Sequence, residues 1–396
     1  MNNLKFPYSK ADISKSDIKS VIKVLKNEYI AQGKVVKKFE ESLQNQFNVR
    51  EAIVCNSGTA ALHSVYRSLG LDKKNGIITT PITFLATANA AKMCGAPVFF
   101  SDVDSETGLI TPKSLEQAFQ RVKFKVKAVV VVHLGGHLCD LEGLSKITKK
   151  YNSFIIEDAC HAIGAANNTR KKEFVGSCKH SIACTFSFHA IKNVTMGEGG
   201  AVTTNNLELA KKIRLNISHG IIRDRKKMVR PPKETPWYYQ MNNFGWNYRA
   251  SEISCALGLN QFKRIKKIIE KRSLIANLYK NYLTYNKYIN LPKFSKKKYG
   301  NGWHLFQLNI SFEKLKIKKQ DFIKHLRAHS IGSQVHYIPL VKQPYYSNNS
   351  EKKFLVGAES FYKNTISIPM YTSLNKKDVK FISKVINDYF NNILIK

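Results

Sequence analysis

The sequence predicts an α/β fold, with a large domain built on a mostly parallel sheet and a small C-terminal α+β domain. Between residues 51 and 205, short apolar runs alternate with stretches of helical spacing, as strands covered by helices on both faces require. After about residue 245, a long helical segment leads to shorter strands. The length of 396 residues is typical of two domains, which we place at residues 1–245 and 246–396.

Seven apolar runs are the expected strands of the large sheet. Each is short, rich in β-branched residues and bounded by polar or glycine-containing segments. They are AIVC (52–55), GIITTP (76–81), APVFFSDV (96–103), AVVVVH (128–133), SFIIEDA (153–159), IACTFSF (182–188) and GGAVTTN (199–205).

Helices are expected where apolar residues recur at helical spacing behind a capping residue. Residues 14–27 open with Ser and Asp, and residues 111–122 open with Thr-Pro, two typical helix starts. Residues 250–283 predict one long helical segment, and residues 374–390 predict a final helix.

The small domain needs strands between those helices. Residues 304–311 (HLFQLNIS) and 333–340 (SQVHYIPL) are the two expected. Residues 223–237 are basic and contain proline, so we expect a surface loop just before the domain boundary.

Composition excludes several classes of protein. A hydrophobic content of 43%, with 21 Gly and 11 Pro, excludes a disordered or low-complexity chain. The seven cysteines are scattered and form no C-x-x-C pair, so we expect no disulfide framework and no metal site. The first residues contain no signal-peptide pattern, and the longest apolar run, residues 128–132, is too short for a membrane. A cytoplasmic protein is therefore expected.

The formal net charge of +36 raises a second hypothesis, a nucleic-acid-binding regulator. Lysine greatly outnumbers arginine, however, and is spread along most of the chain without a nucleic-acid-binding motif. We therefore favour a solvated lysine-rich surface, whose field would still attract small anionic substrates.

Polar residues gather at the ends of three predicted strands, where open α/β sheets bind ligands. Asp158 ends one strand, and His161 follows it; Ser187 ends another, with Lys192 just beyond. A third strand leads into residues 56–62, NSGTAAL, a helix opening of small residues. An acid, a lysine and such an opening are what a pyridoxal phosphate (PLP) enzyme needs.

Each part has a chemical reason. A lysine forms a Schiff base with a carbonyl, and burial lowers its pKa into a usable range. A carboxylate facing the pyridine nitrogen keeps the ring protonated, which makes it an electron sink. A helix N-terminus binds phosphate through free amides and its dipole. Phe84 follows another strand and could cover the ring.

Every one of these residues also has a plainer interpretation. The SGTAAL motif alone is more often an ordinary capped helix, and Lys192 alone is one surface lysine among many. Asp158 after an apolar strand is not specific, and His161 or His189 could be a core or turn histidine. Their common position at strand ends favours the cofactor site.

Six segments, in order and spacing, resemble the DegT/DnrJ/EryC1 family of PLP-dependent sugar-nucleotide aminotransferases. The resemblance extends from residues 31–40 to residues 366–375, and it implies the aspartate aminotransferase fold (fold type I). Four segments, including FSFHAIK, are most similar to the pseudaminic acid biosynthesis branch. The six segments are NSGTAALH, TTPITFLATANA, EDACHAIGA, FSFHAIKNVTMGEGGAV, NYRASEISCALGLNQ and QVHYIPL.

The resemblance implies roles for residues around the cofactor ring. Lys192 would form the Schiff base with PLP and then act as acid and base, while PLP alternates with its pyridoxamine form. Asp158 would face the pyridine nitrogen, and His161 would bond the ring 3′-oxygen. Phe84 would stack on the ring.

Further roles concern the phosphate and the substrate. Gly58, Thr59 and Ser187 would hold the cofactor phosphate. Asn247 would reach the phosphate in the partner subunit, which implies a homodimer. Motif resemblance alone places four residues on the sugar-nucleotide side: Tyr8, Lys34, His336 and Tyr337.

The implied reaction is a ping-pong transamination from L-glutamate to C4 of a UDP-linked 4-keto-6-deoxy sugar. The branch suggests UDP-2-acetamido-2,6-dideoxy-β-L-arabino-hex-4-ulose as that ketone. Legionaminic, perosamine or bacillosamine-type sugars remain alternatives, because the sequence does not fix which ring face meets the ketone. A family subset that dehydrates sugars has His in place of the lysine, so Lys192 argues against that chemistry.

The chain departs from the family pattern at five positions, which weakens the assignment of one sugar more than that of the class. The positions are Asn216, Ile217, His137, Asn193 and Met196.

Overall fold

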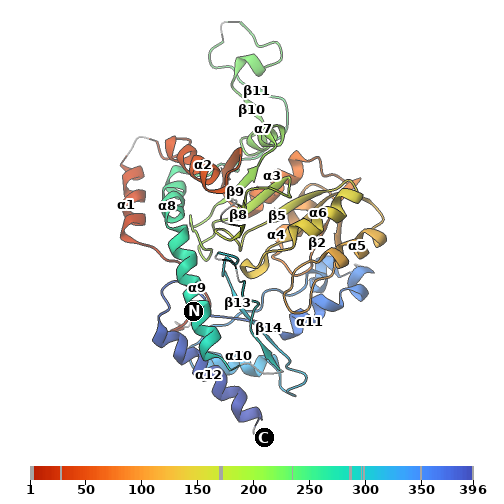
Figure 1. Ribbon diagram of the computed structural model, residues 1–396. Coiled ribbons are helices and arrows are strands. Elements are labelled where there is room, and N and C mark those ends of the chain that lie inside the picture. The colour runs from red at the N-terminus through yellow and green to blue at the C-terminus, as the bar shows by residue number, and fades with distance from the viewer. Residues whose placement is uncertain are drawn as a thin grey trace.

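The computed structural model describes residues 4–26, 29–168, 173–233, 235–284, 288–295, 297, 299–347 and 350–394. A seven-stranded sheet forms the centre of the larger part (Figure 1). Only β9 runs antiparallel to its neighbours, so the sheet is mostly parallel, and all seven predicted runs are confirmed as its strands. In spatial order they are β1 (Glu51–Cys55), β9 (Gly200–Thr204), β8 (Ala183–Ser187), β5 (Phe154–Asp158), β4 (Lys125–Val132), β2 (Asn75–Thr79) and β3 (Val98–Phe100).

Helices cover both faces of this sheet, because alternate strand residues are apolar toward each side. Ile53 and Cys55 of β1 pack in one core, while Ala52 and Val54 pack in another. The first face is covered by α3 (Gly58–Ser68), α4 (Ala86–Met93), α7 (Leu207–Asn216) and α11 (Val356–Asn364). The second is covered by α2 (Lys34–Phe47), α5 (Pro112–Arg121), α6 (Leu141–Lys150) and α8 (Glu252–Lys263).

The two helix starts expected from capping residues are confirmed. Ser14 caps α1 (Lys15–Leu25) and exchanges bonds with Asp17 in a capping box. Thr111 caps α5, with Pro112 in its first turn. Asp17 is fully buried and also bonds Gln261, which joins α1 to α8.

A smaller antiparallel sheet forms the second unit, in the lower part of Figure 1. Its core contains Phe306, Phe322 and Phe390, and also Phe6 from the N-terminal segment. The elements are β12 (Ile289–Asn290), β13 (Phe306–Ile310), β14 (Thr365–Ile368), α9 (Ile265–Tyr282), α10 (Lys319–Ala328) and α12 (Lys376–Leu394). Ile265 and Ile269 of α9 still pack with the large sheet, and the domain boundary at residues 245/246 stays a prediction.

One prediction about this region is confirmed and one is wrong. The long helical segment over residues 250–283 is present as two consecutive helices, α8 and α9, which meet at Arg264, where the backbone leaves helical geometry and the guanidinium binds Asp17. Residues 333–340 form no strand: Gln334 pairs with Ser367 and the chain then turns toward the large sheet. Pro339 has no N–H with which to extend a ladder, and Leu340 N–H donates to Pro81 O instead.

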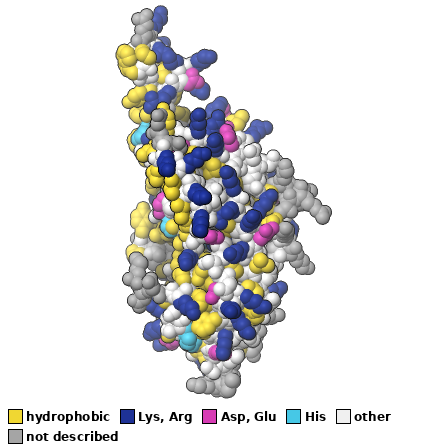
Figure 2. Space-filling model, turned by 90° about the vertical axis from the view of Figure 1, so that its left-hand side faces the viewer, with side chains coloured by type: hydrophobic (Ala, Val, Ile, Leu, Met, Phe, Trp, Pro, Cys, Tyr) yellow, Lys and Arg dark blue, Asp and Glu magenta, His cyan; other side chains and the backbone are white. Residues whose placement is uncertain are grey.

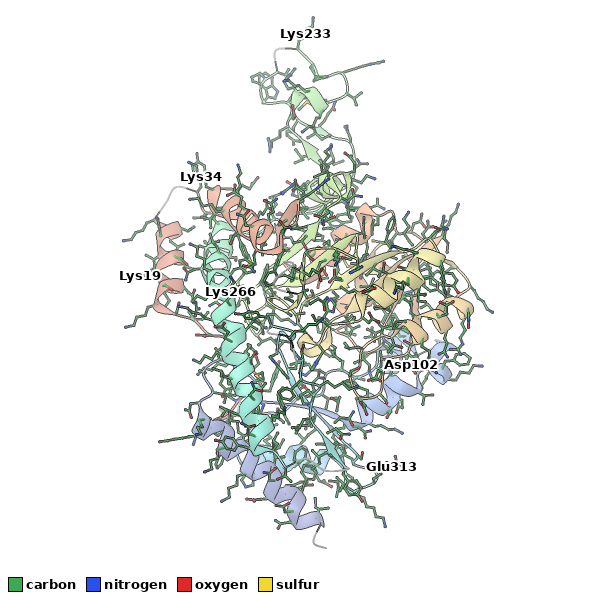
Figure 3. The ribbon with its side chains drawn as sticks, in the orientation of Figure 1. Lys19, Lys34, Asp102, Lys233, Lys266 and Glu313 are labelled. Atoms are coloured by element: carbon green, nitrogen blue, oxygen red, sulfur yellow. The ribbon has the colours of Figure 1, made fainter. Side chains whose placement is uncertain are left out.

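Residues 223–233 and 235–237 lie on an exposed arm that projects beyond the body of the molecule (Figure 1), as expected for a surface loop, and residue 234 of the predicted loop lies outside the described residues. Lys233 lies at its far end (Figure 3). The arm contains β10 (Ile221–Ile222), β11 (Gln240–Met241) and the short helix η2 (Arg225–Lys227). The remaining short elements are β6 (Ala166–Asn168), β7 (Glu173–Phe174), η1 (Leu134–Gly136), η3 (Leu340–Lys342), η4 (Pro344–Tyr346) and η5 (Ser350–Phe354).

Lys and Arg side chains are distributed along the whole face shown in Figure 2 and are not gathered in one patch. This distribution agrees with a solvated lysine-rich surface and gives no support to a nucleic-acid groove. Among the residues described, no helix combines the length and the apolar character that crossing a membrane requires.

Candidate active site

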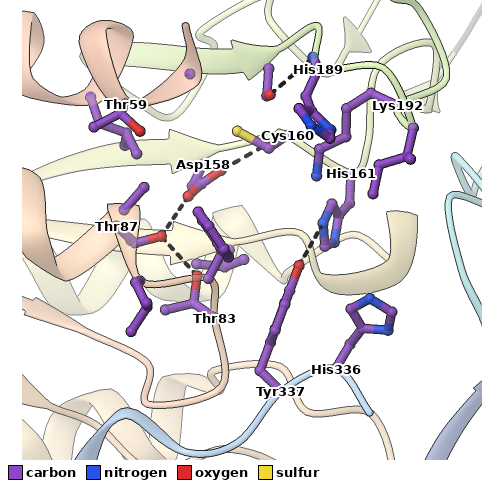
Figure 4. Close-up of a pocket in the computed structure, with 18 of the residues that line it drawn as sticks. Thr59, Thr83, Thr87, Asp158, Cys160, His161, His189, Lys192, His336 and Tyr337 are labelled. Atoms are coloured by element: carbon purple, nitrogen blue, oxygen red, sulfur yellow. Dashed lines mark hydrogen bonds between the residues drawn. The ribbon is translucent and has the colours of Figure 1, made fainter. Parts of the chain in front are cut away.

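A cavity of about 690 Å³ opens at the carboxyl ends of the parallel strands, where the sequence placed the site. It brings together side chains from β5, from the segment after β8 and from the start of α3, and also from the N-terminal segment and residues 334–338 (Figure 4). Ten of the predicted site residues line it: Tyr8, Gly58, Thr59, Phe84, Asp158, His161, Ser187, Lys192, His336 and Tyr337.

Lys192 lies in the turn between β8 and β9, with its side chain directed into the cavity (Figure 4). Burial lowers the pKa of its amine from the ordinary 10.5, and nearby Cys160 and Asp158 oppose part of that shift. A larger fraction of the amine is therefore neutral, and so nucleophilic, than for an exposed lysine.

Asp158 ends β5 and is only 5% exposed. Its Oδ2 accepts a hydrogen bond from the Thr87 hydroxyl at 2.7 Å, and its Oδ1 accepts one from the Cys160 N–H at 3.2 Å. Thr83 lies 2.7 Å from Thr87, hydroxyl to hydroxyl. These donors orient the carboxylate while leaving it beside the cavity.

His161 is buried with its two ring nitrogens in different surroundings. The Gly135 N–H donates to Nδ1 at 3.2 Å, so Nδ1 carries no proton. Burial, followed by the positive field of Lys192 and His336, holds the pKa of His161 well below its ordinary value. The ring is therefore neutral with its proton on Nε2, which lies 3.2 Å from the Tyr337 hydroxyl.

The start of α3 lies close to the end of β8. Ser57 caps the helix by accepting a bond from the Ala60 N–H, and the first amides of a helix have no intrahelical acceptor. A Cβ on Gly58 would lie 2.9 Å from the Ser187 Cβ, so only glycine allows this close approach. Gly58, Thr59 and Ser187 thus surround a site suited to a phosphate.

Aromatic and histidine side chains form the opposite side of the cavity. Phe84 is 58% exposed at its edge, with its ring centroid 6.3 Å from that of Tyr337. Tyr8 and His336 have centroids 5.6 Å apart. Burial raises the pKa of Tyr337, which keeps its hydroxyl protonated.

Two predicted residues lie outside this cavity. Lys34 is exposed at the start of α2, on the upper surface in Figure 3. Asn247 is also exposed, and its backbone carbonyl accepts a bond from Asn56 Nδ2 at 3.3 Å. Because Asn247 was expected to serve the partner subunit, a single chain does not test it.

The sequence reasoning missed three contributors, Thr83, Thr87 and Gly135. The two threonines are four residues apart at the start of α4, within TTPITFLATANA, and that spacing was the available signal. Gly135 acts through its backbone amide, and no residue pattern reveals which side chain such an amide meets.

None of the five unusual positions lines the cavity in the part of the chain that the structure describes. Asn216 is buried and bonds Ser68, while Asn193 Nδ2 donates to Gly302 O at 2.6 Å. His137 contacts Asn301. The departures therefore change the framework around the cavity, and they give no reason to reassign the substrate.

Comparison with protein families matches residues 11–387 to the DegT/DnrJ/EryC1/StrS aminotransferase family. The chain belongs to this family. It is 39% identical over 375 residues to a UDP-4-amino-4,6-dideoxy-N-acetyl-beta-L-altrosamine transaminase of Campylobacter jejuni, covering 95% of each chain. A transaminase of the same name from Helicobacter pylori is 33% identical, with 99% of each chain covered.

Comparison with solved structures gives the same family. PseC of Helicobacter pylori, an aminotransferase involved in the biosynthesis of pseudoaminic acid, superposes with a TM-score of 0.87 at 32% identity, covering 98% of this chain and 99% of that one. The fold is therefore the PLP-dependent fold type I, and the protein is an enzyme of the aminotransferase class. The cavity fits PLP, since it combines a lysine amine, a buried carboxylate and a phosphate site narrow enough to need Gly58.

Proposed function

We propose that this enzyme uses PLP to transfer an amino group from L-glutamate to C4 of a UDP-linked 4-keto-6-deoxy-N-acetyl hexose, in pseudaminic acid-type nucleotide-sugar biosynthesis. The observation that supports it most is that Lys192 and Asp158 face one cavity from the ends of neighbouring strands. The names of the Campylobacter and Helicobacter relatives support the sugar.

When bound, PLP supplies an electron sink for the carbon that loses its proton. The chain supplies the charges and donors around it. Asp158 would hold a positive charge on the pyridine nitrogen, an interaction of about 4 kcal/mol at close range and an effective dielectric of 20. His161 would offer its Nε2 proton to the ring oxygen, because Gly135 occupies Nδ1.

Lys192 has two tasks. Its neutral amine would hold the cofactor through the carbonyl carbon, and the same Nζ would take and return the proton that moves during transamination. The lowered pKa suits both tasks, because an amine that is always protonated is neither nucleophile nor base.

The remaining residues position the two ligands. Gly58, Thr59 and Ser187 bind the cofactor phosphate, and Phe84 covers the ring. Tyr8, His336 and Tyr337 lie where the sugar nucleotide would enter. Burial lowers the pKa of His336 to about 3, so it meets the substrate as a neutral hydrogen-bonding group. Lys34 is exposed outside the cavity, and we keep it only as a contact for the far end of the nucleotide.

A homodimer is part of the proposal, with Asn247 reaching the partner's phosphate site. The arm just before Asn247 exposes large apolar side chains, which Figure 2 shows gathered at the top of the molecule, and such side chains commonly bind another chain. They are Val229, Trp237, Tyr239, Met241 and Phe244, each at least 52% exposed. We also propose a cytoplasmic location, where such a biosynthetic enzyme would meet L-glutamate.

Reductive trapping tests the cofactor. Purified protein is incubated with PLP and treated with sodium borohydride, and peptides are then analysed by mass spectrometry. We expect one pyridoxyl phosphate on Lys192, none in Lys192→Ala, and normal labelling of the surface control Lys211→Ala. An unlabelled wild-type Lys192 would overturn the proposal.

A substrate panel tests the sugar. The enzyme, L-glutamate and UDP-, dTDP- or GDP-linked 4-keto sugars are combined, and products are identified by mass spectrometry. We expect amination of the UDP-linked N-acetyl sugar at the highest rate. Preference for a legionaminic, perosamine or bacillosamine precursor would keep the chemistry and replace the sugar.

A further inference from the structure

Two threonine hydroxyls connect the start of α4 to Asp158. Thr83 Oγ1 lies 2.7 Å from Thr87 Oγ1, and Thr87 Oγ1 lies 2.7 Å from Asp158 Oδ2. All three side chains are buried, at 2%, 1% and 5% exposure. Figure 4 shows the chain of bonds along one side of the cavity.

The direction of the protons follows from the chemistry of the groups. An ionised carboxylate only accepts hydrogen bonds, so Thr87 must donate to Asp158. A hydroxyl has one proton, so Thr87 accepts from Thr83. Both threonine protons therefore point toward the carboxylate, and each bond in such a chain strengthens the next.

This arrangement fixes the orientation of Asp158. Its Oδ2 accepts from the Thr87 hydroxyl and its Oδ1 from the Cys160 N–H. The β-branched Thr87 has few rotamers, and its backbone carbonyl accepts a bond from the Tyr66 hydroxyl at 3.0 Å.

We propose that Thr87, supported by Thr83, is a positioning residue that holds the Asp158 carboxylate aimed at the pyridine nitrogen of the cofactor. The inference rests on the proposed use of PLP.

The test compares three variants with a matched control. Thr87→Val removes the hydroxyl and keeps the branched shape, whereas Thr87→Ser keeps the hydroxyl. Thr83→Val removes one hydrogen bond from the series that leads to Asp158 and leaves the bond from Thr87 to Asp158 in place. Thr80→Val is the control, because Thr80 is equally buried in the same loop and its hydroxyl accepts from the Ile82 N–H, away from Asp158.

Two quantities are measured: the dissociation constant of PLP, from fluorescence titration of the apoprotein, and the pH midpoint of the visible absorbance band of the bound cofactor. We expect Thr87→Val to weaken PLP binding about tenfold or more, since hydrogen bonds to charged groups are strong. We expect the pH midpoint to rise. A ring with less positive charge withdraws less electron density from the Schiff base, so the Schiff base keeps its proton to higher pH. Thr83→Val should change both about threefold less, and Thr80→Val neither.

Normal values in Thr87→Ser together with altered values in Thr87→Val would support the proposal. Unchanged affinity and midpoint in Thr87→Val, even with a lowered melting temperature, would overturn it, and so would a Thr87→Ser that behaves like the valine variant. If Thr87→Val does not fold, Thr83→Val decides by the same two measurements. A wild-type protein that binds no PLP would instead refute the proposed function.

Discussion

Strand β5 ends in two successive buried carboxylates, Glu157 and Asp158, which lie on opposite faces of the sheet. Glu157 is bonded to His133 Nε2 at 3.0 Å and to Ser181 Oγ at 2.5 Å. His133 Nδ1 accepts from the Cys139 N–H, so the ring donates its Nε2 proton to Glu157. The hydrogen bonds of Glu157 are thus made to other side chains of the protein.

Asp158 is almost equally buried, yet its donors leave it facing a cavity that also contains Lys192. Burial and good hydrogen bonds are therefore shared by a structural carboxylate and by the carboxylate that we propose to bind the cofactor. What separates them is whether a second reactive group faces the same space. The following variants test that difference between the two carboxylates.

The largest effect is expected from Asp158→Asn. The amide keeps the shape and loses the charge that protonates the ring, so we expect about a 10³-fold loss in kcat/KM, equivalent to the roughly 4 kcal/mol of the ion pair. Steady-state kinetics measure it, and circular dichroism confirms the fold. Activity within tenfold of the wild type would contradict the assignment.

Glu157→Ala should have the opposite effect to Asp158→Asn, because it should lower stability and change activity little. It leaves His133 Nε2 and Ser181 Oγ without their acceptor, and each unsatisfied buried group costs about 1–3 kcal/mol. We expect the free energy of unfolding in urea to fall by about 3 kcal/mol, with kcat per folded site changed less than about threefold. Glu157→Gln, which keeps an acceptor, should lose less stability. A large loss of kcat at normal stability would remove the contrast between the two carboxylates.

Gly58→Ala tests the proposed phosphate site at the start of α3. The added Cβ would lie 2.9 Å from Ser187 Cβ, so the space between α3 and β8 must widen. We expect PLP binding to weaken about tenfold, a typical effect of a small steric change near 1.4 kcal/mol. Pyridoxal, which lacks the phosphate, should bind as it does to the wild type; equal losses for both ligands would argue against a phosphate site here.

The smallest effect at neutral pH concerns His336, which the cavity keeps neutral. Its folded pKa, about 3, lies below the ordinary 6.5, so the unfolded chain binds the proton first as pH falls. Stability should therefore decrease from pH 6.5 toward pH 3, with His336 contributing up to about 1.4 kcal/mol per pH unit. Urea unfolding of His336→Gln at several pH values should show a flatter dependence. The exposed control His329→Gln should follow the wild type.

Much of the fold could be predicted because local patterns determine it. The seven strands are continuous apolar runs, and the starts of α1 and α5 carry capping residues. The error occurs where tertiary contacts decide. Residues 333–340 leave the small sheet for the cavity.

The same division holds for the site. Lys192, Asp158 and Ser187 could be predicted because they follow strands that end at one edge. The proton on His161 Nε2 could not, because it depends on a backbone amide 26 residues away. The link from Thr87 to Asp158, which are 71 positions apart in sequence, is equally invisible to local spacing.

The N-terminal segment is bonded to residues 331 and 332, just before the cavity residues His336 and Tyr337. Phe6 pairs with Ile331, and its carbonyl accepts the Gly332 N–H, so Tyr8 is attached to the same small unit as His336 and Tyr337. The side of the cavity that would bind the sugar thus comes largely from segments outside the large sheet, and it meets the reactive side at two bonds, from Tyr337 to His161 and from Ser9 to the Ile191 carbonyl. Exchanging residues 4–9 and 331–338 together for those of a relative, with Ser9 and Tyr337 retained, should transplant sugar preference while these two bonds are kept.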